Sequence, residues 1–221
     1  MLKLGIDDAG RGPVIGPMVL AGCLIDEKIE KEFKKLGVKD SKQLTSKRRE
    51  FLAEIIREKA ITFEVIIIHP KEIDGKNAEG VNLNAVEAFA CARIINEINK
   101  GFDKMNVVID CPSTNLSKWQ DFLKMNIQNL SNLDISCEHK ADRNHVAVSA
   151  ASILAKSIRE REMDSLKKKY GSEIGSGYTS DPLTTKFLKK YIKKYDNDGI
   201  FRKSWATWKN AFGALNQQKL S

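Results

Sequence analysis

The sequence predicts an α/β protein: a mixed β-sheet flanked by helices, with a helical extension at its C-terminal end. Three observations lead to this fold class. Two apolar stretches near the start indicate neighbouring strands, further strands then alternate with helical patterns, and the last third of the chain is basic and helical. With 221 residues, the chain is long enough for one domain with an appendage.

Local signals define the first elements. The two opening strands are joined by a glycine-rich turn, which indicates an antiparallel hairpin. Thr45 or Ser46 can cap the helix that follows, and His69-Pro70 ends the β-branched strand after it. The expected elements of this half are strands at 2–8, 14–25 and 61–68, and a helix that ends at about Lys59.

The second half alternates between helices and strands. Its expected elements are a helix at 82–100, a strand at 106–110, a helix near 116–127, a strand at 133–139 and a long helix from about Arg143. A glycine-rich break at 171–182 separates that helix from one or two basic helices. We expect residues 1–155 to form the core, and residues 156–221 to pack on it without forming an independent domain.

The positive charge is unevenly distributed along the chain. The formal net charge is +8, and the whole excess lies in residues 156–221, which hold 15 basic and 7 acidic residues. The stretches "KFLKKYIKKY" and "FRKSWATWKN" interleave basic with aromatic residues. Such a one-sided field suits a polyanion such as nucleic acid, although a solvated helix face would give the same pattern.

Neither a membrane segment nor a disulfide framework is indicated. No apolar run approaches the roughly 20 residues that span a bilayer. The opening residues lack the pattern of a signal peptide, so a cytoplasmic protein is expected. The four cysteines lie far apart in apolar stretches, which predicts buried, reduced thiols.

Acidic residues stand at the predicted ends of strands. Asp7 ends the first strand with Asp8 beside it, Asp110 ends "VVID", and Asp142 lies between the last strand and the long helix. Ligands collect in the crevices that loops form at strand ends. Carboxylates gathered there repel one another unless a cation offsets their charge, and an all-oxygen set suits Mg²⁺ or Mn²⁺. Two such ions can drive phosphodiester hydrolysis without a protein nucleophile.

Each acid also has a plainer interpretation. Asp110, before Cys-Pro, can start a turn, and Asp142 can cap the helix that follows. Successive strand residues point to opposite faces, so Asp8 can join Asp7 only if the strand ends or bulges there. The spacing alone leaves open whether the four acids converge.

Five motifs, in order along nearly the whole chain, resemble those of the type 2 ribonucleases H (ribonuclease HII) in their archaeal form. They are "GIDDAGRGPVIGPMV", "DSKQL", "VVIDCP", "KADRNHVAVSAASILAK" and "GSGYTSDP". The resemblance implies an RNase H-like fold and cleavage of the RNA strand of RNA–DNA hybrids. It also implies cleavage at single ribonucleotides in duplex DNA, leaving 5′-phosphate and 3′-hydroxyl ends.

The resemblance also implies which residues do the work. For catalysis and metal binding they are Asp7, Asp8, Asp110 and Asp142, which would hold two Mg²⁺ or Mn²⁺ ions during catalysis; for substrate binding they are Gly10, Arg11, Gly12, Lys42, Lys156 and Tyr178. The Gly-Arg-Gly segment would sense the ribose next to the scissile phosphate, the tyrosine would stack on the sugar, and the lysines would contact phosphates. The 2′-hydroxyl both donates and accepts hydrogen bonds, and it distinguishes RNA from DNA.

The sequence departs from the family pattern in two places. Position 8 is usually glutamate, and the shorter Asp8 is expected to support catalysis with an altered metal affinity or Mn²⁺/Mg²⁺ preference. Archaeal relatives can dock to the sliding clamp through a C-terminal motif of glutamine and aromatics. The ending "LNQQKLS" lacks the aromatics, so clamp binding is not supported and a monomer is expected. The three histidines, His69, His139 and His145, are expected to have structural or peripheral roles.

Two other functions compete with this interpretation. Another RNase H-like nuclease would share the acid cluster but has no reason to carry "GRG" and the "GSGY" tyrosine. A non-catalytic protein that binds RNA–DNA hybrids would need only the basic C-terminal region.

Overall fold

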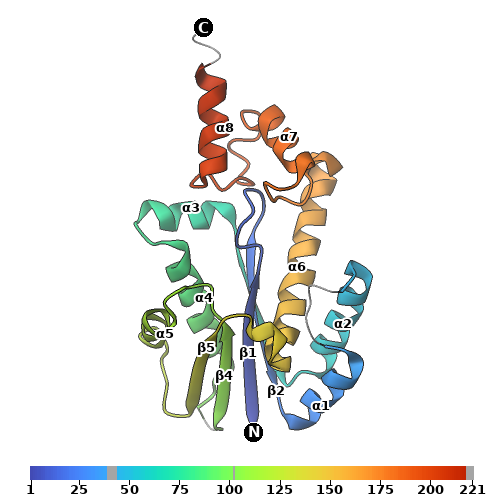
Figure 1. The fold of residues 1–221 in the computed structure, drawn as a ribbon, viewed down its shortest axis with the longest axis vertical. Helices are drawn as coiled ribbons and strands as arrows, with labels where there is room; N and C mark the ends of the chain where they lie inside the picture. Colours follow the sequence, from blue (N-terminus) through green and yellow to red (C-terminus); the bar gives the residue numbers. More distant parts are fainter. Residues whose placement is uncertain (39–43, 102, 218–221) are drawn as a thin grey trace. The chain divides into compact units, whose positions relative to one another are not determined.

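The computed structural model describes residues 1–38, 44–101 and 103–217. It contains a five-stranded mixed sheet with the strand order β3-β2-β1-β4-β5 (Figure 1). Strand β1 pairs antiparallel with β2 and parallel with β4, and β4 pairs parallel with β5. The strands are β1 Leu2–Ala9, β2 Met18–Ile25, β3 Thr62–Ile68, β4 Met105–Asp110 and β5 Leu133–Glu138. The predicted fold class, a mixed sheet flanked by helices, is confirmed.

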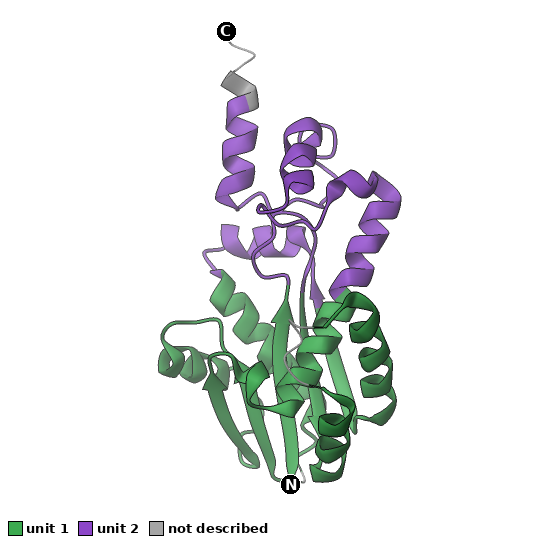
Figure 2. Cartoon of the chain, turned by 45° about the vertical axis from the view of Figure 1, so that its right-hand side comes forward, with its two compact units in different colours: residues 1–9, 19–66, 83–158 green, residues 10–18, 67–82, 159–221 purple. Residues whose placement is uncertain are grey.

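The chain divides into two compact units (Figure 2). The sheet unit comprises residues 1–9, 19–66 and 83–158, and the C-terminal unit comprises residues 10–18, 67–82 and 159–221. The C-terminal unit therefore includes two segments from the first half of the sequence. Our division into a core at 1–155 and a helical region at 156–221 stays a prediction.

Three helices of the sheet unit begin where a side chain caps them. Asp26, Thr45 and Asn115 each accept a hydrogen bond from a main-chain N–H of the first turn. The cap at Thr45 confirms one of the two predicted positions. The helices are α1 Glu27–Leu36, α2 Ser46–Lys59, α4 Leu83–Ile98, α5 Leu116–Lys124 and the first half of α6 Val146–Tyr170.

Helices α6 and α4 cover opposite faces of the sheet. Gly5 lies against Ala147 of α6, where an added Cβ would come within 2.1 Å of the helix backbone. Gly22 lies against Ile94 of α4 in the same way. Gly22 pairs with Ile6, the neighbour of Gly5, so the two glycines face opposite sides of the sheet. The α6 face is therefore the face of Gly5, and the residues two positions along share it.

The C-terminal unit holds a loop from the start of the chain, residues 10–17, which we call the glycine loop. Val14 and Ile15 are fully buried with Phe187 and Phe201 in the apolar core of this unit. The N–H groups of Val14 and Gly16 donate to the carbonyls of Gly177 and Ile200. The remaining helices are α3 Pro70–Ala78, α7 Pro182–Tyr191 and α8 Ala206–Gln217, with a 3-10 turn at Ser172–Ile174.

Three local predictions were wrong or incomplete. The strand predicted at 14–25 begins only at Met18, because the apolar residues before it pack in the core of the C-terminal unit. Helix α3 was not expected after His69-Pro70, where Pro70 occupies the first turn that proline favours. Helix α1 was also missed: most of its residues are charged, and Phe33 is its one buried side chain.

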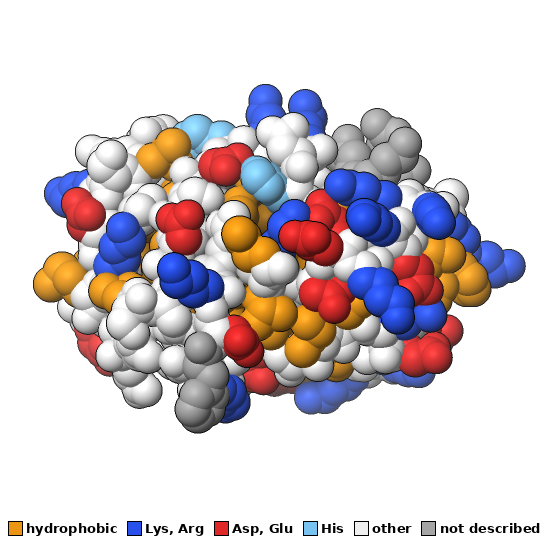
Figure 3. Space-filling view, turned by 90° about the horizontal axis from the view of Figure 1, so that it is seen from below, with side chains coloured by type: hydrophobic (Ala, Val, Ile, Leu, Met, Phe, Trp, Pro, Cys, Tyr) orange, Lys and Arg blue, Asp and Glu red, His pale blue; other side chains and the backbone are white. Residues whose placement is uncertain are grey.

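The surface of the protein carries charged side chains (Figure 3), and a membrane span requires a helix that is both long and apolar. In the part of the chain that the structure describes, no helix is both long enough and apolar enough to cross a bilayer. Acidic and basic side chains are interspersed on the face shown in Figure 3. All four cysteines are buried and none forms a disulfide, as predicted.

The contact between β1 and α6 gives a first test. Gly5→Ala would place a methyl group inside the backbone of Ala147, so we expect a loss of stability of about 1–3 kcal/mol or more. Thermal unfolding measures it, at about 2–4 °C per kcal/mol for a chain of this size. Gly75→Ala in α3 is the control, because an added Cβ there meets nothing within 4 Å. Equal melting temperatures for Gly5→Ala and the parent would contradict the packing.

Candidate active site

Strands β1 and β4 place two carboxylates side by side. The parallel register pairs Ile6 with Ile109, and the next residues on the two strands are Asp7 and Asp110. Corresponding residues of neighbouring parallel strands share a face, and Asp7 shares its face with Gly5. Both carboxylates therefore lie on the face that α6 covers.

A short 3-10 turn before α6 supplies the third carboxylate. Asp142 lies in the turn Ala141–Arg143 and is 1% exposed. The N–H of Ala141 donates to Asp110 Oδ1 at 3.3 Å, and the Ser149 hydroxyl donates to the Asp142 carbonyl. Helix α6 begins at Val146, so the residue directly before it is His145, and Asp142 lies three residues further back in the 3-10 turn.

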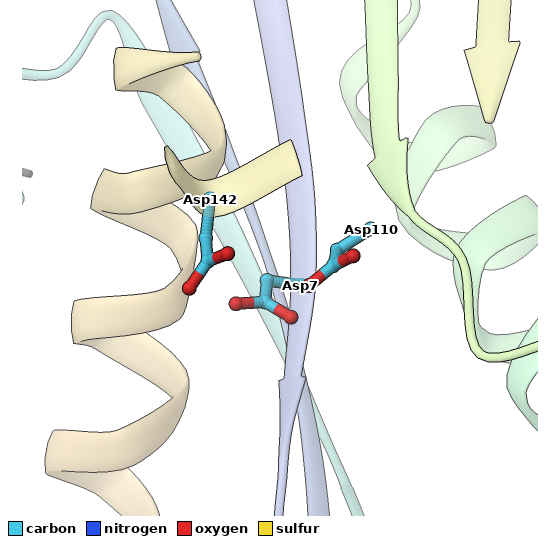
Figure 4. A group of neighbouring side chains, drawn as sticks. All are labelled: Asp7, Asp110 and Asp142. Carbon is cyan, nitrogen blue, oxygen red and sulfur yellow. The ribbon is translucent and has the colours of Figure 1, made fainter. Parts of the chain in front are cut away.

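The carboxylates of Asp7, Asp110 and Asp142 point toward one another (Figure 4). One carboxylate oxygen from each lies within 4.8 Å of those from the other two. Asp7 and Asp142 are buried and Asp110 is half-buried. The predicted convergence is thus confirmed for these three acids.

The surroundings of Asp7 in this cluster disfavour its ionised form. Burial raises the pKa of the Asp7 carboxyl well above its usual range, and the charges of Asp8 and Asp110 raise it further. Hydrogen bonds from the Ser152 side chain and the Asp8 N–H lower the Asp7 pKa without reversing the shift. In the absence of a cation, Asp7 therefore holds a proton more tightly than an ordinary aspartate does.

A hard divalent cation fits the donor set. All three groups are carboxylates that converge at one place, and Mg²⁺ and Mn²⁺ prefer oxygen ligands. A cation there would favour the ionised form of Asp7, against the burial and the neighbouring charges that raise its pKa, and would compete with the proton. The cluster is a candidate metal site.

Asp8 is not one of the three clustered acids. Strand β1 continues in regular pairing through Asp8↔Leu20 and Ala9↔Val19, so the break or bulge that would bring Asp8 beside Asp7 is missing. Asp8 therefore shares the face of Ile6 and Gly22, which α4 covers. The charge of Asp8 contributes to the raised pKa of Cys91 on α4, after the effects of burial and of Glu87. The role of Asp8 as a metal ligand stays a prediction.

The predicted substrate-binding residues of the C-terminal unit lie around Arg159. Gly10 has a φ of +80°, and an added Cβ would lie 2.2 Å from Arg159 Nε. The Arg159 guanidinium lies 4.9 Å from the ring centroid of Tyr178 and donates to the Ser176 carbonyl. Gly12 is exposed, and the nearest atom to an added Cβ there is Tyr178 Cε1 at 3.9 Å. Gly10, Gly12 and Tyr178 thus belong to one local arrangement, with Arg11 between the glycines.

The other predicted residues lie elsewhere. Lys42 falls outside the described residues, and Lys156 lies on α6 within the sheet unit. His139 Nδ1 is 3.1 Å from the Cys111 carbonyl, and His145 Nε2 is 2.9 Å from Glu138 Oε2. His69 precedes α3 and makes no side-chain capping bond.

Sequence reasoning missed the arginines and the tryptophan that support the glycine loop. Arg202 was counted in the basic surface of "FRKSWATWKN", but it is fully buried and bonds to that loop. Trp205 Nε1 donates to the Gly12 carbonyl at 3.2 Å, and Arg159 is only 9% exposed. A buried arginine and an exposed one look alike in sequence, so no local signal separates them.

Comparison with known proteins places this chain in a family. The family model described as Ribonuclease HII matches residues 4–208. A ribonuclease HII of Methanococcus maripaludis is 44% identical over 220 residues, which cover 98% of this chain and 90% of the relative. A crystal structure of ribonuclease H2 from Pyrococcus horikoshii is 37% identical, with a TM-score of 0.84, and covers 96% of this chain and 97% of that one.

Two further structures concern ligands and partners. A ribonuclease HII from Archaeoglobus fulgidus was solved in complex with PCNA; it is 38% identical, with a TM-score of 0.82, over 95% of this chain and 96% of that one. A ribonuclease HIII, 21% identical with a TM-score of 0.79 over 97% of this chain and 70% of that one, was solved in complex with Mn²⁺. Because the family model and the relatives each cover nearly the whole sequence, this chain belongs to the ribonuclease HII family, metal-dependent endonucleases that cleave the RNA strand of RNA–DNA hybrids.

Proposed function

We propose that this enzyme cuts RNA–DNA hybrids and also single ribonucleotides embedded in duplex DNA, using two divalent ions held by its acidic cluster. The convergence of Asp7, Asp110 and Asp142 within 4.8 Å carries the proposal. The Mn²⁺ bound by the related ribonuclease HIII supports the choice of Mg²⁺ or Mn²⁺. The proposed set also includes Asp8, the next residue on β1, although strand alternation places its side chain on the face that α4 covers.

The reaction adds water across a phosphodiester bond. The oxygen of water bonds to phosphorus, the bond from phosphorus to the 3′ oxygen breaks, and the products carry a 5′-phosphate and a 3′-hydroxyl. Divalent ions bound at such a cluster would lower the pKa of water and neutralise negative charge on the phosphate. Asp7, Asp110 and Asp142 hold those ions and are themselves held by the strand register and by the Ala141–Asp110 hydrogen bond.

The glycine loop and Tyr178 supply recognition in this proposal. The open side of Gly12 allows a sugar to approach the main chain closely, and the half-exposed Tyr178 ring offers a surface for stacking. Arg11 and the lysines Lys42 and Lys156 bind phosphates. Arg159 holds the Tyr178 ring from one side.

The proposed partners are the RNA–DNA hybrid and the ribonucleotide-containing duplex, bound by a monomer. The complex of the Archaeoglobus fulgidus relative with PCNA makes clamp binding an interaction to measure for this chain as well. Residues 218–221 lie outside the described part of the chain, so this interaction is measured with the full chain.

One cleavage assay separates the proposed function from its competitors. A duplex with one ribonucleotide and an all-DNA duplex of the same sequence are incubated with the enzyme and Mg²⁺ or Mn²⁺. We expect cutting only beside the ribonucleotide, and Asp110→Asn is expected to bind without cutting. Cutting of both duplexes would identify a different nuclease, and binding without cutting by the parent would identify a non-catalytic protein.

Asp7→Asn is expected to abolish cleavage and to stabilise the metal-free protein at neutral pH. The Asp7 pKa is higher in the folded than in the unfolded state, so the ionised carboxylate destabilises the fold once the pH rises above its unfolded value of about 3.9. The gain in melting temperature should therefore disappear at low pH. Asp134→Asn, at an exposed position of β5, is the control and should change neither property. An unchanged or lower melting temperature for Asp7→Asn at neutral pH would contradict the electrostatics.

Asp8→Glu restores the residue usual in the family and tests the shorter side chain. Both proteins are expected to cleave, but with different metal concentrations for half-maximal rate or a different ratio of Mn²⁺ to Mg²⁺ activity. The reason is the strict coordination geometry of Mg²⁺, which a side chain shorter by one methylene meets differently. Superimposable titration curves would show that Asp8 has no such influence.

Gly12→Ala is expected to fold normally and to weaken cleavage. The added methyl group meets only Tyr178 Cε1, at 3.9 Å, but it occupies the side where the sugar approaches. We expect an increase in KM of about tenfold, which corresponds to a loss of about 1.4 kcal/mol of binding free energy where the methyl group excludes the sugar. Gly10→Ala is the contrasting variant, since its φ of +80° and its contact with Arg159 predict a loss of stability. A parental KM for Gly12→Ala would exclude close contact at this residue.

A further inference from the structure

Arg202 is a buried cation that donates several hydrogen bonds to the glycine loop. Its side chain is fully buried in the C-terminal unit. Nη2 donates to the Gly10 carbonyl at 2.6 Å, and Nη1 donates to the Arg11 carbonyl at 2.6 Å. Nε and Nη2 both donate to the Gly16 carbonyl, at 3.1 and 3.0 Å. The planar guanidinium thus spans the two ends of the glycine loop, which a single-point donor such as lysine cannot do.

Trp205 donates a hydrogen bond to the next carbonyl of the glycine loop, that of Gly12. Its Nε1 donates to the Gly12 carbonyl at 3.2 Å, and the Arg202 guanidinium lies 5.0 Å from the centroid of its ring. Three successive carbonyls, those of Gly10, Arg11 and Gly12, therefore each accept a hydrogen bond from one of these two side chains.

This arrangement fixes the direction of the loop's N–H groups. In a planar trans peptide, the carbonyl and the following N–H point to opposite sides, and no described peptide bond is cis. With the Gly10 and Arg11 carbonyls turned toward Arg202, the N–H groups of Arg11 and Gly12 point the other way. Two neighbouring donors with one direction suit an oxygen of a sugar or a phosphate.

The segment that carries Arg202 and Trp205 is itself anchored. The Arg202 N–H donates to the Val14 carbonyl at 2.9 Å, next to the bridge between Ile15 and Phe201. Asp74 of α3 accepts hydrogen bonds from the N–H groups of Lys203 and Ser204 and from the Ser204 hydroxyl. The donors therefore come from a fixed support within the same unit.

We propose that Arg202 and Trp205 are positioning residues for ribose recognition, which hold the main chain of Gly10–Arg11–Gly12 with its N–H groups aimed at the sugar. This rests on the proposed function of the glycine loop. An apolar side chain could fill the same space without the cost of burying a charge. An apolar side chain could not donate hydrogen bonds to the carbonyls of Gly10, Arg11 and Gly12, as Arg202 and Trp205 do. The two side chains therefore fix the conformation of the loop.

The test measures ribose preference separately from rate. The folded enzyme cleaves a duplex with one ribonucleotide, and an all-DNA duplex of the same sequence is added as a competitive inhibitor. The ratio of the inhibitor's Ki to the substrate's KM reports how much the single 2′-hydroxyl contributes to binding. A merely structural defect lowers kcat and leaves this ratio unchanged.

Arg202→Lys keeps the positive charge but loses the planar guanidinium that donates to several carbonyls at once. Trp205→Phe keeps an aromatic ring but loses the indole N–H that donates to the Gly12 carbonyl. For Arg202→Lys we expect the ratio of Ki to KM to fall about tenfold; if the parent's ratio is below about ten, we expect it to fall to one. For Trp205→Phe we expect a fall of about threefold. Trp208→Phe is the matched control: Trp208 Nε1 is buried with no hydrogen-bond partner, so its loss should leave the ratio unchanged.

The proposal is overturned if folded Arg202→Lys and Trp205→Phe keep the parental ratio, whatever their kcat. It is equally overturned if Trp208→Phe lowers the ratio as much as Trp205→Phe does. Should Arg202→Lys fail to fold, Trp205→Phe alone decides. A parent enzyme that does not cut at the ribonucleotide would refute the proposed function itself, and that outcome is seen before any variant is compared.

Discussion

The convergence of the Asp7, Asp110 and Asp142 carboxylates is the constraint on which the candidate metal site depends. One carboxylate oxygen of each residue lies within 4.8 Å of those of the other two, and the secondary-structure elements that carry the three residues hold them there. The parallel register of β1 and β4 fixes two of them, and Gly5 lets α6 approach so closely that the turn before it adds the third. Burial and the charges of Asp8 and Asp110 raise the pKa of Asp7, which shows that this arrangement disfavours the ionised carboxylate. A divalent cation would stabilise that ionised form.

The acidic cluster and the glycine loop are held by different supports. The acids stand on strands and on a turn tied to a strand, whereas the glycine loop is bonded within the C-terminal unit by Arg202, Trp205 and the Gly177 carbonyl. In the sequence, only Ala9 separates Asp8 from the start of that loop at Gly10. The positive charge of the last third is also not all surface charge, because Arg202 is buried within it.

Much of the fold could be predicted because its signals are local. The β-branched runs at 61–68 and 106–110, and the cap at Thr45, mark elements that the structure confirms. Phe33 alone could not reveal α1, and the loop before Met18 looked like strand because its apolar residues pack on distant helices. For the site, strand ends indicated three acids, but which face Asp8 takes depends on where pairing stops. The support of the glycine loop by Arg202 joins residues far apart in sequence and leaves no local pattern.

The most direct test of the metal site is calorimetry of Mn²⁺ binding in buffers with different heats of ionisation. Because burial and the neighbouring charges raise the pKa of the Asp7 carboxyl, Mn²⁺ binding should release protons from it, and the release should grow as the pH is lowered. A binding heat that is the same in every buffer, or an equal release from Asp7→Asn, would contradict the account.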